Sequence, residues 1–250
     1  MDGRARPAEQ ASILAAVLAA ARGAAPAGVV VFDLDSTLLD NRPRQARILR
    51  DYGRRAGLAP LAGARPEHVV SWDLADAMRR AGCSPLEVAR HLLALRRFWA
   101  ATFFTSEYCR EDVPVPGAPA FAREVAAAGA QVGYVTGRPR RMEAGTLDVF
   151  RRCGLPLPDG RRVHLFMKPE APLGDDAWKA LAAARVEALG PVVAAFDNEP
   201  AHVNGYALRW PRARCVHLDT DHSARPVAVL PHVPSIADFR LGPPAAAAAG

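Results

Sequence analysis

Several features of common protein classes are scarce or missing in this 250-residue sequence. No run of apolar residues is long enough to cross a bilayer as a helix. The patterns of dinucleotide-binding proteins, P-loop nucleotidases, zinc proteases and serine hydrolases are also absent, namely GxGxxG, GxxxxGKS/T, HExxH and GxSxG. The four cysteines, Cys83, Cys109, Cys153 and Cys215, form neither a CxxC pair nor a paired zinc pattern. This cysteine usage favours a reducing, cytoplasmic location.

Lysine is almost absent too. The 32 basic residues include only two lysines, Lys168 and Lys179, so arginine supplies nearly all of the positive charge. With 26 acidic residues the formal net charge is +6, which favours anionic partners such as phosphorylated small molecules, nucleic acid or an acidic surface. Where arginine is the default cation, a lysine suggests that a compact ammonium group is needed at that position.

An alanine-rich run occupies residues 11–28, ASILAAVLAAARGAAPAG. Its length and small residues resemble the core of a signal peptide, with Arg4 and Arg6 ahead of it. Glu9 and Gln10 at the start of the run are unusual in a secretory segment, so we favour a first helix that packs on the core. A cytoplasmic protein is the expectation that follows.

The apolar segments predict an α/β fold. Half of the residues are hydrophobic, which is enough for a sizeable core. Five short apolar segments alternate with helical patterns, as in strands covered by helices on both faces: VVVFDL, AQVGYVT, VHLFMK, PVVAAFD and RCVHLD. We therefore expect a doubly wound, mostly parallel, five-stranded Rossmann-like sheet with an inserted α-helical cap. The core would comprise residues 1–40 and 114–240, the cap residues 41–113, and a low-complexity tail residues 241–250.

The expected cap is rich in arginine and in regularly spaced apolar residues. Residues 41–113 hold 13 arginines against 8 acidic residues, most of the positive excess of the chain. This excess fits either a solvated helical surface or a lid that attracts anions to a site beneath it. An apolar stripe recurs at spacings of three and four, and it is more typical of helix packing than of a cofactor site: Val88, Leu92, Leu95, Trp99 and Phe103.

Polar residues follow four of the expected strands directly. In a parallel α/β sheet, ligands collect beyond the carboxyl ends of the strands, so these residues are the candidates for a functional site. Each alone could be a helix cap or a turn residue, but four strand ends agree. The candidates are Asp33 and Asp35; Thr136, Gly137 and Arg138; Lys168; and Asp197, Asn198 and Glu199.

These four segments together resemble the motifs of the haloacid dehalogenase-like (HAD) phosphohydrolases. DLDST resembles the first motif, DxDxT; VTGR the second; the lysine of FMKP the third; and FDNE the acidic fourth. Their order matches, with 103 residues from Asp33 to Thr136, room enough for a helical cap, then 32 to Lys168 and 29 to Asp197. The resemblance covers roughly residues 28 to 220.

The resemblance implies a magnesium-dependent phosphatase that forms an aspartyl-phosphate. Asp33 would be the nucleophile, and Asp35 would protonate the leaving oxygen and later activate water. Mg²⁺ would bind the carboxylates of Asp33 and Asp197 and the backbone carbonyl of Asp35. The residue chemistry agrees, because a phosphate monoester is a dianion that repels nucleophiles, and a hard cation relieves both that repulsion and the crowding of carboxylates.

Phosphate binding and the fourth motif complete the expected site. The resemblance assigns phosphate contacts to Thr136, Gly137, Arg138 and Lys168. In the commonest family pattern a second acid follows the first by four or five positions, and those positions here are Ala201 and His202. Asn198 or Glu199 is the nearest substitute as metal support, and the sequence does not choose between them.

Other functions remain open at the level of sequence. The arginine-rich insert could bind nucleic acid or serve a polynucleotide terminal-phosphate-processing protein, with Trp99, Phe103 and Phe104 as stacking residues, although their spacing favours packing. A phosphoryl transferase would use the same motifs. A non-catalytic scaffold is disfavoured because every charged position that the chemistry needs is filled. The preferred partner is a small phosphorylated substrate, with no membrane.

Overall fold

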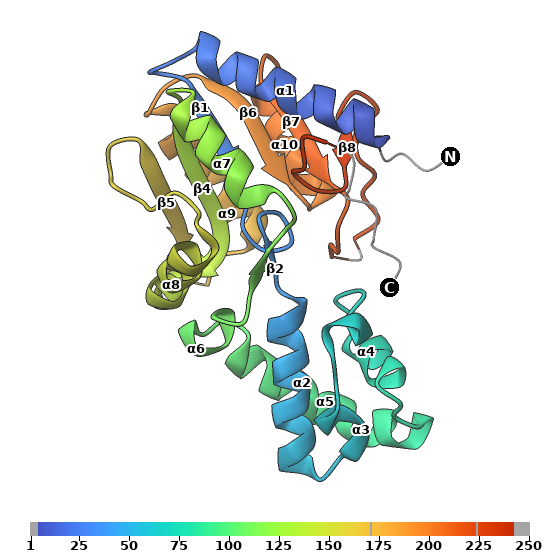
Figure 1. Ribbon diagram of the computed structural model, residues 1–250. Helices are drawn as coiled ribbons and strands as arrows, with labels where there is room; N and C mark the ends of the chain where they lie inside the picture. The colour runs from blue at the N-terminus through green and yellow to red at the C-terminus, as the bar shows by residue number, and fades with distance from the viewer. Residues whose placement is uncertain (1–4, 171, 224, 243–250) are drawn as a thin grey trace.

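The computed structural model describes residues 5–170, 172–223 and 225–242. Its centre is a parallel six-stranded sheet in the order β5-β4-β1-β6-β7-β8, with a group of helices below it (Figure 1). The strands are β1 (Val29–Phe32), β4 (Gln131–Pro139), β5 (Val163–Lys168), β6 (Val192–Asp197), β7 (Arg214–Leu218) and β8 (Ser235–Ile236).

The sheet confirms the predicted fold class. All five predicted segments form neighbouring parallel strands, and β1 is buried along its whole length. The sixth strand, β8, was not predicted. It forms the edge of the sheet and pairs with β7 over only two residues, His217 with Ser235 and Leu218 with Ile236. A segment that short has no alternation of apolar and polar residues for a sequence pattern to detect.

Helices cover both faces of the sheet. Alternate residues of β1 point to opposite faces, so Val30 and Phe32 pack in one core, and Val29 and Val31 pack in the other. On the first face lie α1 (Pro7–Gly23), α7 (Ala118–Ala127) and α8 (Glu143–Cys153); on the second lie α9 (Asp175–Glu187) and α10 (Pro200–Arg209).

Helix α1 contains most of the alanine-rich run. Its Leu14, Val17 and Ala21 are fully buried against the sheet. No helix within the described ranges is long and apolar enough to cross a membrane. Of the predicted tail, residues 243–250 lie outside the described residues.

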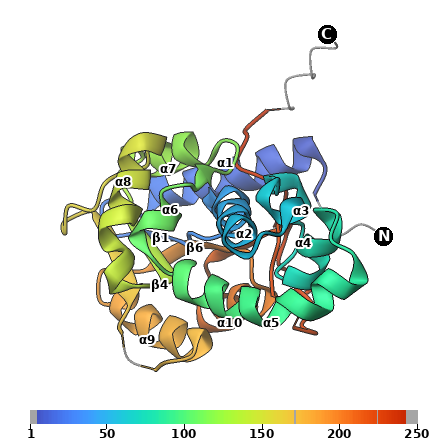
Figure 2. The same cartoon turned by 90° about the horizontal axis from the view of Figure 1, so that it is seen from below.

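A helical insert leaves the core after β1 and returns before α7. A two-stranded antiparallel ribbon, β2 (Leu39–Asp40) with β3 (Val113–Pro114), joins it to the core. Between these strands lie α2 (Arg42–Ala56), α3 (Ala59–Ala62), the 3-10 turn Pro66–His68, α4 (Leu74–Arg80), α5 (Pro85–Thr102) and α6 (Ser106–Cys109); the core has a second 3-10 turn at Arg140–Met142. Figures 1 and 2 both place the insert beyond the carboxyl ends of the strands.

Local sequence explains why the insert is helical. Ser84 caps the start of α5 and forms a capping box with Glu87. Helix α2 ends at Gly57, whose φ of 67° lies in the left-handed region that glycine tolerates best. The apolar stripe of α5 packs as predicted, because Val88 and Leu95 are buried in a separate hydrophobic cluster of the insert.

Candidate active site

The loop after β1 brings two of the predicted aspartates to one cavity. Asp33 and Asp35 both line a space of about 210 Å³ between the sheet and the insert. The loop turns sharply behind them, where the carbonyl oxygen of Leu34 accepts hydrogen bonds from the N–H groups of Thr37, Leu38 and Leu39. The spacing of two residues therefore presents both carboxylates at the same opening.

Lys179 holds Asp33 and Asp197 together. Its Nζ atom donates to Asp33 Oδ1 at 2.5 Å, to Asp197 Oδ2 at 2.8 Å and to the carbonyl oxygen of Val135 at 3.0 Å. All three charged residues are almost completely buried, and all three line the cavity. We call Asp33, Lys179 and Asp197 the lysine cluster. Its formal charge is −1, because two carboxylates share one ammonium group.

Burial and neighbouring charge set the protonation of the lysine cluster. Burial raises the pKa of Asp33 to about 7, against the opposing effect of Lys179. Burial tends to raise the pKa of Asp197 as well, but Lys179 and His202 outweigh this effect and hold the pKa of Asp197 well below its usual range. Burial alone would lower the pKa of Lys179, and the two carboxylates instead raise it well above its ordinary value. Lys179 is therefore a permanent cation.

The structure places Lys179, and not the predicted Lys168, against Asp33 and Asp197. Lys168 ends β5, an edge strand that is two positions from β1, and neighbouring strands lie roughly 4.8 Å apart. Its Nζ atom donates instead to Asp175 Oδ1 at 2.7 Å, on the rim of the cavity. Helix α9 crosses the sheet closer to the centre, so its first turns bring Lys179 over the end of β1.

A sequence signal for Lys179 did exist. The residues Trp178, Ala182, Ala183 and Val186 are buried, and Lys179 lies three and four positions before the two alanines. A helix places such residues on one face. A lone lysine on an apolar helix face, in a chain with two lysines, signals a buried cation with anionic partners.

A second charged cluster surrounds Asp35. Arg138 Nε donates to Asp35 Oδ2 at 2.8 Å and Arg138 Nη2 to Asp35 Oδ1 at 2.9 Å, while Arg44 Nη2 donates to Oδ1 at 2.6 Å. Both arginines also donate to Asp112, at 2.8 Å from Arg44 Nε and 2.6 Å from Arg138 Nη2. Asp35, Arg44, Asp112 and Arg138 form what we call the arginine clamp. Its formal charge is zero.

The arginine clamp joins the insert to the core. Arg44 belongs to α2 and Asp112 precedes β3, whereas Asp35 and Arg138 belong to the core. The side chains of Arg44, Asp112 and Arg138 have no exposed surface. Burial tends to raise the pKa of Asp35, but the two guanidinium groups outweigh it and hold that pKa well below the usual range.

The clamp changes how two predicted phosphate ligands are understood. Arg138 was expected to contact phosphate, but its guanidinium is buried on Asp35, Asp112 and the hydroxyl of Thr146. Thr136 is fully buried too, and its hydroxyl accepts the N–H of Arg138 at 3.2 Å. Gly137 is the member of this motif that lines the cavity. A side chain there would press against Asp175, because a Cβ atom would lie 3.3 Å from that carboxylate.

The fourth motif surrounds Asp197 with polar contacts. Asn198 donates to the carbonyl oxygen of Asp221 at 2.7 Å and accepts from Thr37 at 3.1 Å. Glu199 accepts from Ser223, at 2.6 Å from its N–H and 2.7 Å from its hydroxyl. Both residues line the cavity, so either could support a metal ion through water.

His202 occupies the position where the commonest family pattern has a second acid. Its Nδ1 atom lies 3.6 Å from Asp197 Oδ1, and its Nε2 atom lies 2.8 Å from Asp176 Oδ1. Burial tends to lower the pKa of His202, but Asp197 and Asp176 outweigh it and raise that pKa. An imidazole replaces a carboxylate here.

The insert supplies an aromatic wall to the same cavity. Trp72, Phe103 and Phe104 line it opposite the charged residues of the core. Phe103 stacks with Trp99 at a centroid distance of 4.4 Å and meets Trp72 edge to face at 5.4 Å, so the wall is braced from behind. Of the three residues singled out for stacking, Trp99 thus packs behind the wall, while Phe103 and Phe104 belong to it.

The nearest arginines of the insert are already paired. Arg42 forms an ion pair with Asp40 at 2.6 Å. Arg44 is in the clamp, and Arg47 pairs with Glu107 at 2.5 Å and Glu111 at 3.1 Å. None of these three arginines lines the 210 Å³ cavity.

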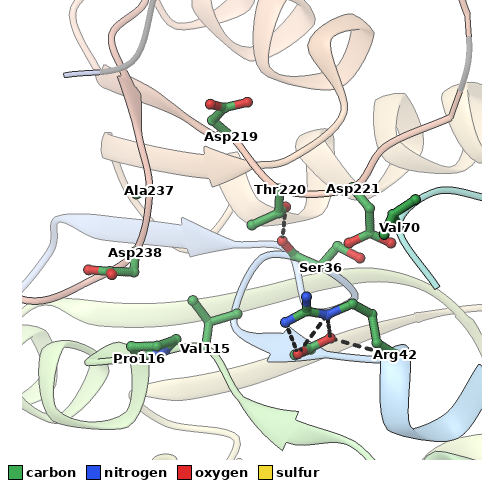
Figure 3. Close-up of a pocket in the computed structure, with 11 residues that line it drawn as sticks. Ser36, Arg42, Val70, Val115, Pro116, Asp219, Thr220, Asp221, Ala237 and Asp238 are labelled. Carbon is green, nitrogen blue, oxygen red and sulfur yellow. Dashed lines mark hydrogen bonds and ion pairs between the residues drawn. The ribbon is translucent and has the colours of Figure 1, made fainter. Parts of the chain in front are cut away.

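A second cavity of about 330 Å³ lies beside the loop that follows β7. Figure 3 shows Thr220 next to Ser36, whose carbonyl oxygen accepts the Thr220 hydroxyl at 2.5 Å, with Asp219 and Asp221 in the same loop. The polar loop that follows β7 therefore lines this space. It contains no counterpart to the lysine shared by two carboxylates, so we place the candidate active site in the 210 Å³ cavity.

The residues present fit a hard divalent cation. Asp33 and Asp197 end neighbouring strands, and Asp33 Oδ2 accepts no hydrogen bond from the part of the chain that the structure describes. A phosphate dianion added to the lysine cluster would give a charge of −3, which needs a cation. No three acidic, histidine or cysteine side chains among the described residues form a ready-made metal site. Mg²⁺ suits such a donor set, because it is commonly held by one or two carboxylates together with substrate phosphate and water.

The family of the chain follows from its match to a family model. The model of haloacid dehalogenase-like hydrolases matches residues 28–186, which include both clusters except for Asp197. The chain belongs to this family and is a hydrolase. Among curated proteins, none matches the sequence significantly.

Solved structures support the fold. The chain is similar to a provisionally assigned phosphatase from Clostridium difficile, with 12% identity, a TM-score of 0.52 and coverage of 83% of this chain and 92% of that chain. It is also similar to Protein Tyrosine Kinase A of Mycobacterium tuberculosis, with 15% identity, a TM-score of 0.51 and coverage of 86% and 95%. A provisionally assigned phosphoglycolate phosphatase from Lactobacillus delbrueckii has 12% identity, a TM-score of 0.51 and coverage of 86% and 95%. At these identities the likeness establishes the fold alone.

Proposed function

We propose that the chain is a magnesium-dependent phosphohydrolase that cleaves a small phosphate monoester through an aspartyl-phosphate. The observation that carries this proposal is the lysine cluster, in which a buried carboxylate at a strand end faces a cavity and is held by an ammonium group. A nucleophile needs a fixed position and a nearby cation to approach a phosphate dianion. Asp33 has both.

Each residue of the lysine cluster has a distinct task in this proposal. An oxygen of Asp33 attacks phosphorus, the bond from phosphorus to the ester oxygen breaks, and the leaving oxygen takes a proton from solvent. Water later attacks the same phosphorus, gives up a proton to solvent, and frees Asp33 as inorganic phosphate is released. Lys179 keeps Asp33 aligned and offsets the charge of the incoming phosphate. Asp197 fixes the ammonium group from the other side. When bound, Mg²⁺ would be held by Asp33, Asp197 and the Asp35 carbonyl, and it would neutralise and orient the phosphate.

Asp35 needs a different assignment from the one its motif suggests. Both of its carboxylate oxygens accept hydrogen bonds from guanidinium groups. One of these guanidinium groups belongs to the insert and the other to the core. We assign it the positioning of the insert against the nucleophile loop. A proton-transfer role would first require Asp35 to leave the two arginines.

The insert, residues 41–113, is proposed to act as the cap that selects the substrate. It lies beyond the carboxyl ends of the strands and contributes the aromatic wall (Figure 2). The partner in this proposal is a small phosphorylated molecule, and the location is cytoplasmic.

The test compares two aspartate-to-asparagine variants. Asp33→Asn should abolish phosphate release from p-nitrophenyl phosphate in the presence of Mg²⁺, because an amide is nearly isosteric but is not a nucleophile. Asp148→Asn is the matched control, since Asp148 pairs with Arg110 and Arg151 on the surface. Acid-quenched wild-type enzyme should carry a hydroxylamine-labile phosphate that Asp33→Asn lacks. Full activity in Asp33→Asn would overturn the assignment.

A further inference from the structure

The candidate active site has two unlike halves. Its core half consists almost wholly of charged and polar side chains, whereas its insert half presents the rings of Trp72, Phe103 and Phe104. No arginine or lysine of the insert lines the cavity, and Lys179 is the only fixed cation among its described lining residues. The insert therefore offers no cation to pair with a second anionic group on the substrate.

From this division we propose that the substrate is a phosphate monoester carrying a single aromatic ring, which the wall of Trp72, Phe103 and Phe104 recognises. The inference rests on the proposed function, since it takes the phosphate to lie against the lysine cluster. Beyond that function, the inference specifies the class of phosphate ester that the enzyme selects. Multiply charged sugar phosphates and polyphosphates would be poor substrates, because they would bring further anions to an aromatic wall that has no cation to pair with them.

Size and rigidity agree with one ring. A cavity of 150 Å³ lined by apolar side chains is large enough to hold benzene. The 210 Å³ here leaves room for a ring beside the phosphate. Phe103 is buried and braced by Trp72 and Trp99, so its position is fixed before a substrate arrives. Phe104 is half-buried and meets Phe103 edge to face at 5.0 Å.

The main test uses two substrates that differ by a ring remote from the reacting bond. 2-Phenylethyl phosphate and propyl phosphate are both primary alkyl esters with leaving alcohols of similar acidity, so a difference in kcat/KM reports recognition of the ring. Burial of an aromatic group of this size predicts a preference of about 10- to 100-fold for the phenyl ester. Phe104→Ala should reduce the preference to less than about threefold, because it removes one of the rings that the phenyl group contacts.

A matched control, Phe98, lies on α5, the helix that precedes the turn with Phe104. Phe98 packs within the hydrophobic clusters of the insert and does not line the cavity. Phe98→Leu should keep the preference for the phenyl ester. If Phe104→Ala does not fold, Phe104→Leu removes the ring while filling most of the space, and it should lower the preference at least threefold. An unchanged preference in a folded Phe104 variant would overturn the proposed role of the wall.

A binding experiment separates this inference from the proposed function. 2-Phenylethylphosphonate and propylphosphonate cannot be hydrolysed, and their binding in Mg²⁺ buffer can be followed by tryptophan fluorescence, with Trp72 in the wall. Tighter binding of the phenyl compound without turnover of either ester would support the ring site and refute the phosphatase. Turnover of both esters with equal kcat/KM, or equal binding of both phosphonates, would overturn the ring site.

Discussion

The two charged clusters of the candidate site differ although they begin two residues apart. The lysine cluster joins Asp33 and Asp197 through one shared ammonium group and keeps a formal charge of −1. The arginine clamp joins Asp35 and Asp112 through two guanidinium groups and is neutral. Each is buried, yet only the lysine cluster has an unbalanced negative charge that a metal cation could neutralise.

The type of cation explains much of the difference. A guanidinium donates in a fixed planar fork and suits a permanent pair of carboxylates, whereas an ammonium is a compact charge that leaves other oxygens free. The clamp spans the insert and the core, and the lysine cluster lies wholly within the core. In our proposal, the first carboxylate of DLDST is therefore arranged for chemistry and the second for holding the insert in place.

The largest expected effect comes from the only two lysines of the chain. Lys179→Met should lower kcat/KM by about 10³-fold and cost about 3–5 kcal/mol of stability, because it leaves two buried carboxylates unpaired. Lys168→Met should change kcat/KM by less than about fivefold, since it removes one partly exposed ion pair. Steady-state assays and urea denaturation of both variants measure these effects. A larger loss of kcat/KM in Lys168→Met than in Lys179→Met would instead identify Lys168 as the lysine of the site.

Changes in the arginine clamp should affect the stability of the fold more than the rate of the reaction. Arg44→Met leaves Asp35 and Asp112 to share one arginine and should lower the free energy of unfolding by about 3–5 kcal/mol. Arg47, one turn away on α2, forms partly exposed ion pairs, so Arg47→Met should cost no more than about 1 kcal/mol. Urea denaturation compares the two. Equal losses would mean that the clamp is no more than another surface ion pair.

The two aspartates of DLDST should also respond to pH with opposite sign. The lowered pKa of Asp35 contributes stability above about pH 4, and this contribution is lost as the pH falls toward the folded-state value. Asp35→Asn should therefore cost on the order of 2 kcal/mol at pH 7, with a smaller penalty below pH 4. The pKa of Asp33 is raised to about 7, so its ionisation costs stability as the pH rises from about 4 to 7. Asp33→Asn should become more stable relative to the wild type over that interval.

Urea denaturation in metal-free buffer at pH 4 and pH 8 measures both differences. Metal is excluded because a cation on Asp33 would lower its pKa and hide the effect. If both variants shift in the same direction between these values, the contrast between the clusters does not lie in their protonation.

The sequence predicted the strand ends but not how side chains from elsewhere meet them. Asp33, Asp35 and Asp197 follow apolar runs directly, so the sheet alone places them together. Lys179 and Arg44 reach the site from helices, and their positions depend on helix packing angles that no local pattern encodes. Arg138 is the instructive case, because its place at a strand end was predicted while its burial on Asp35 and Asp112 depends on the insert. Phe103 and Phe104 of the aromatic wall were predicted as packing for the same reason.

The smallest expected effect tests the assignment of Asp35 most directly. A residue that protonates the leaving oxygen contributes about 10²- to 10⁴-fold, and its loss harms esters of weakly acidic alcohols far more than esters of phenols. A residue that holds the insert in place affects both kinds of ester alike, because the closed arrangement matters to each. Asp35→Asn should therefore lower kcat/KM for p-nitrophenyl phosphate and for propyl phosphate by factors that agree within about threefold. A much larger deficit on propyl phosphate would mean that Asp35 leaves Arg44 and Arg138 during turnover and acts as the acid, and the difference between the two clusters would then belong only to the resting enzyme.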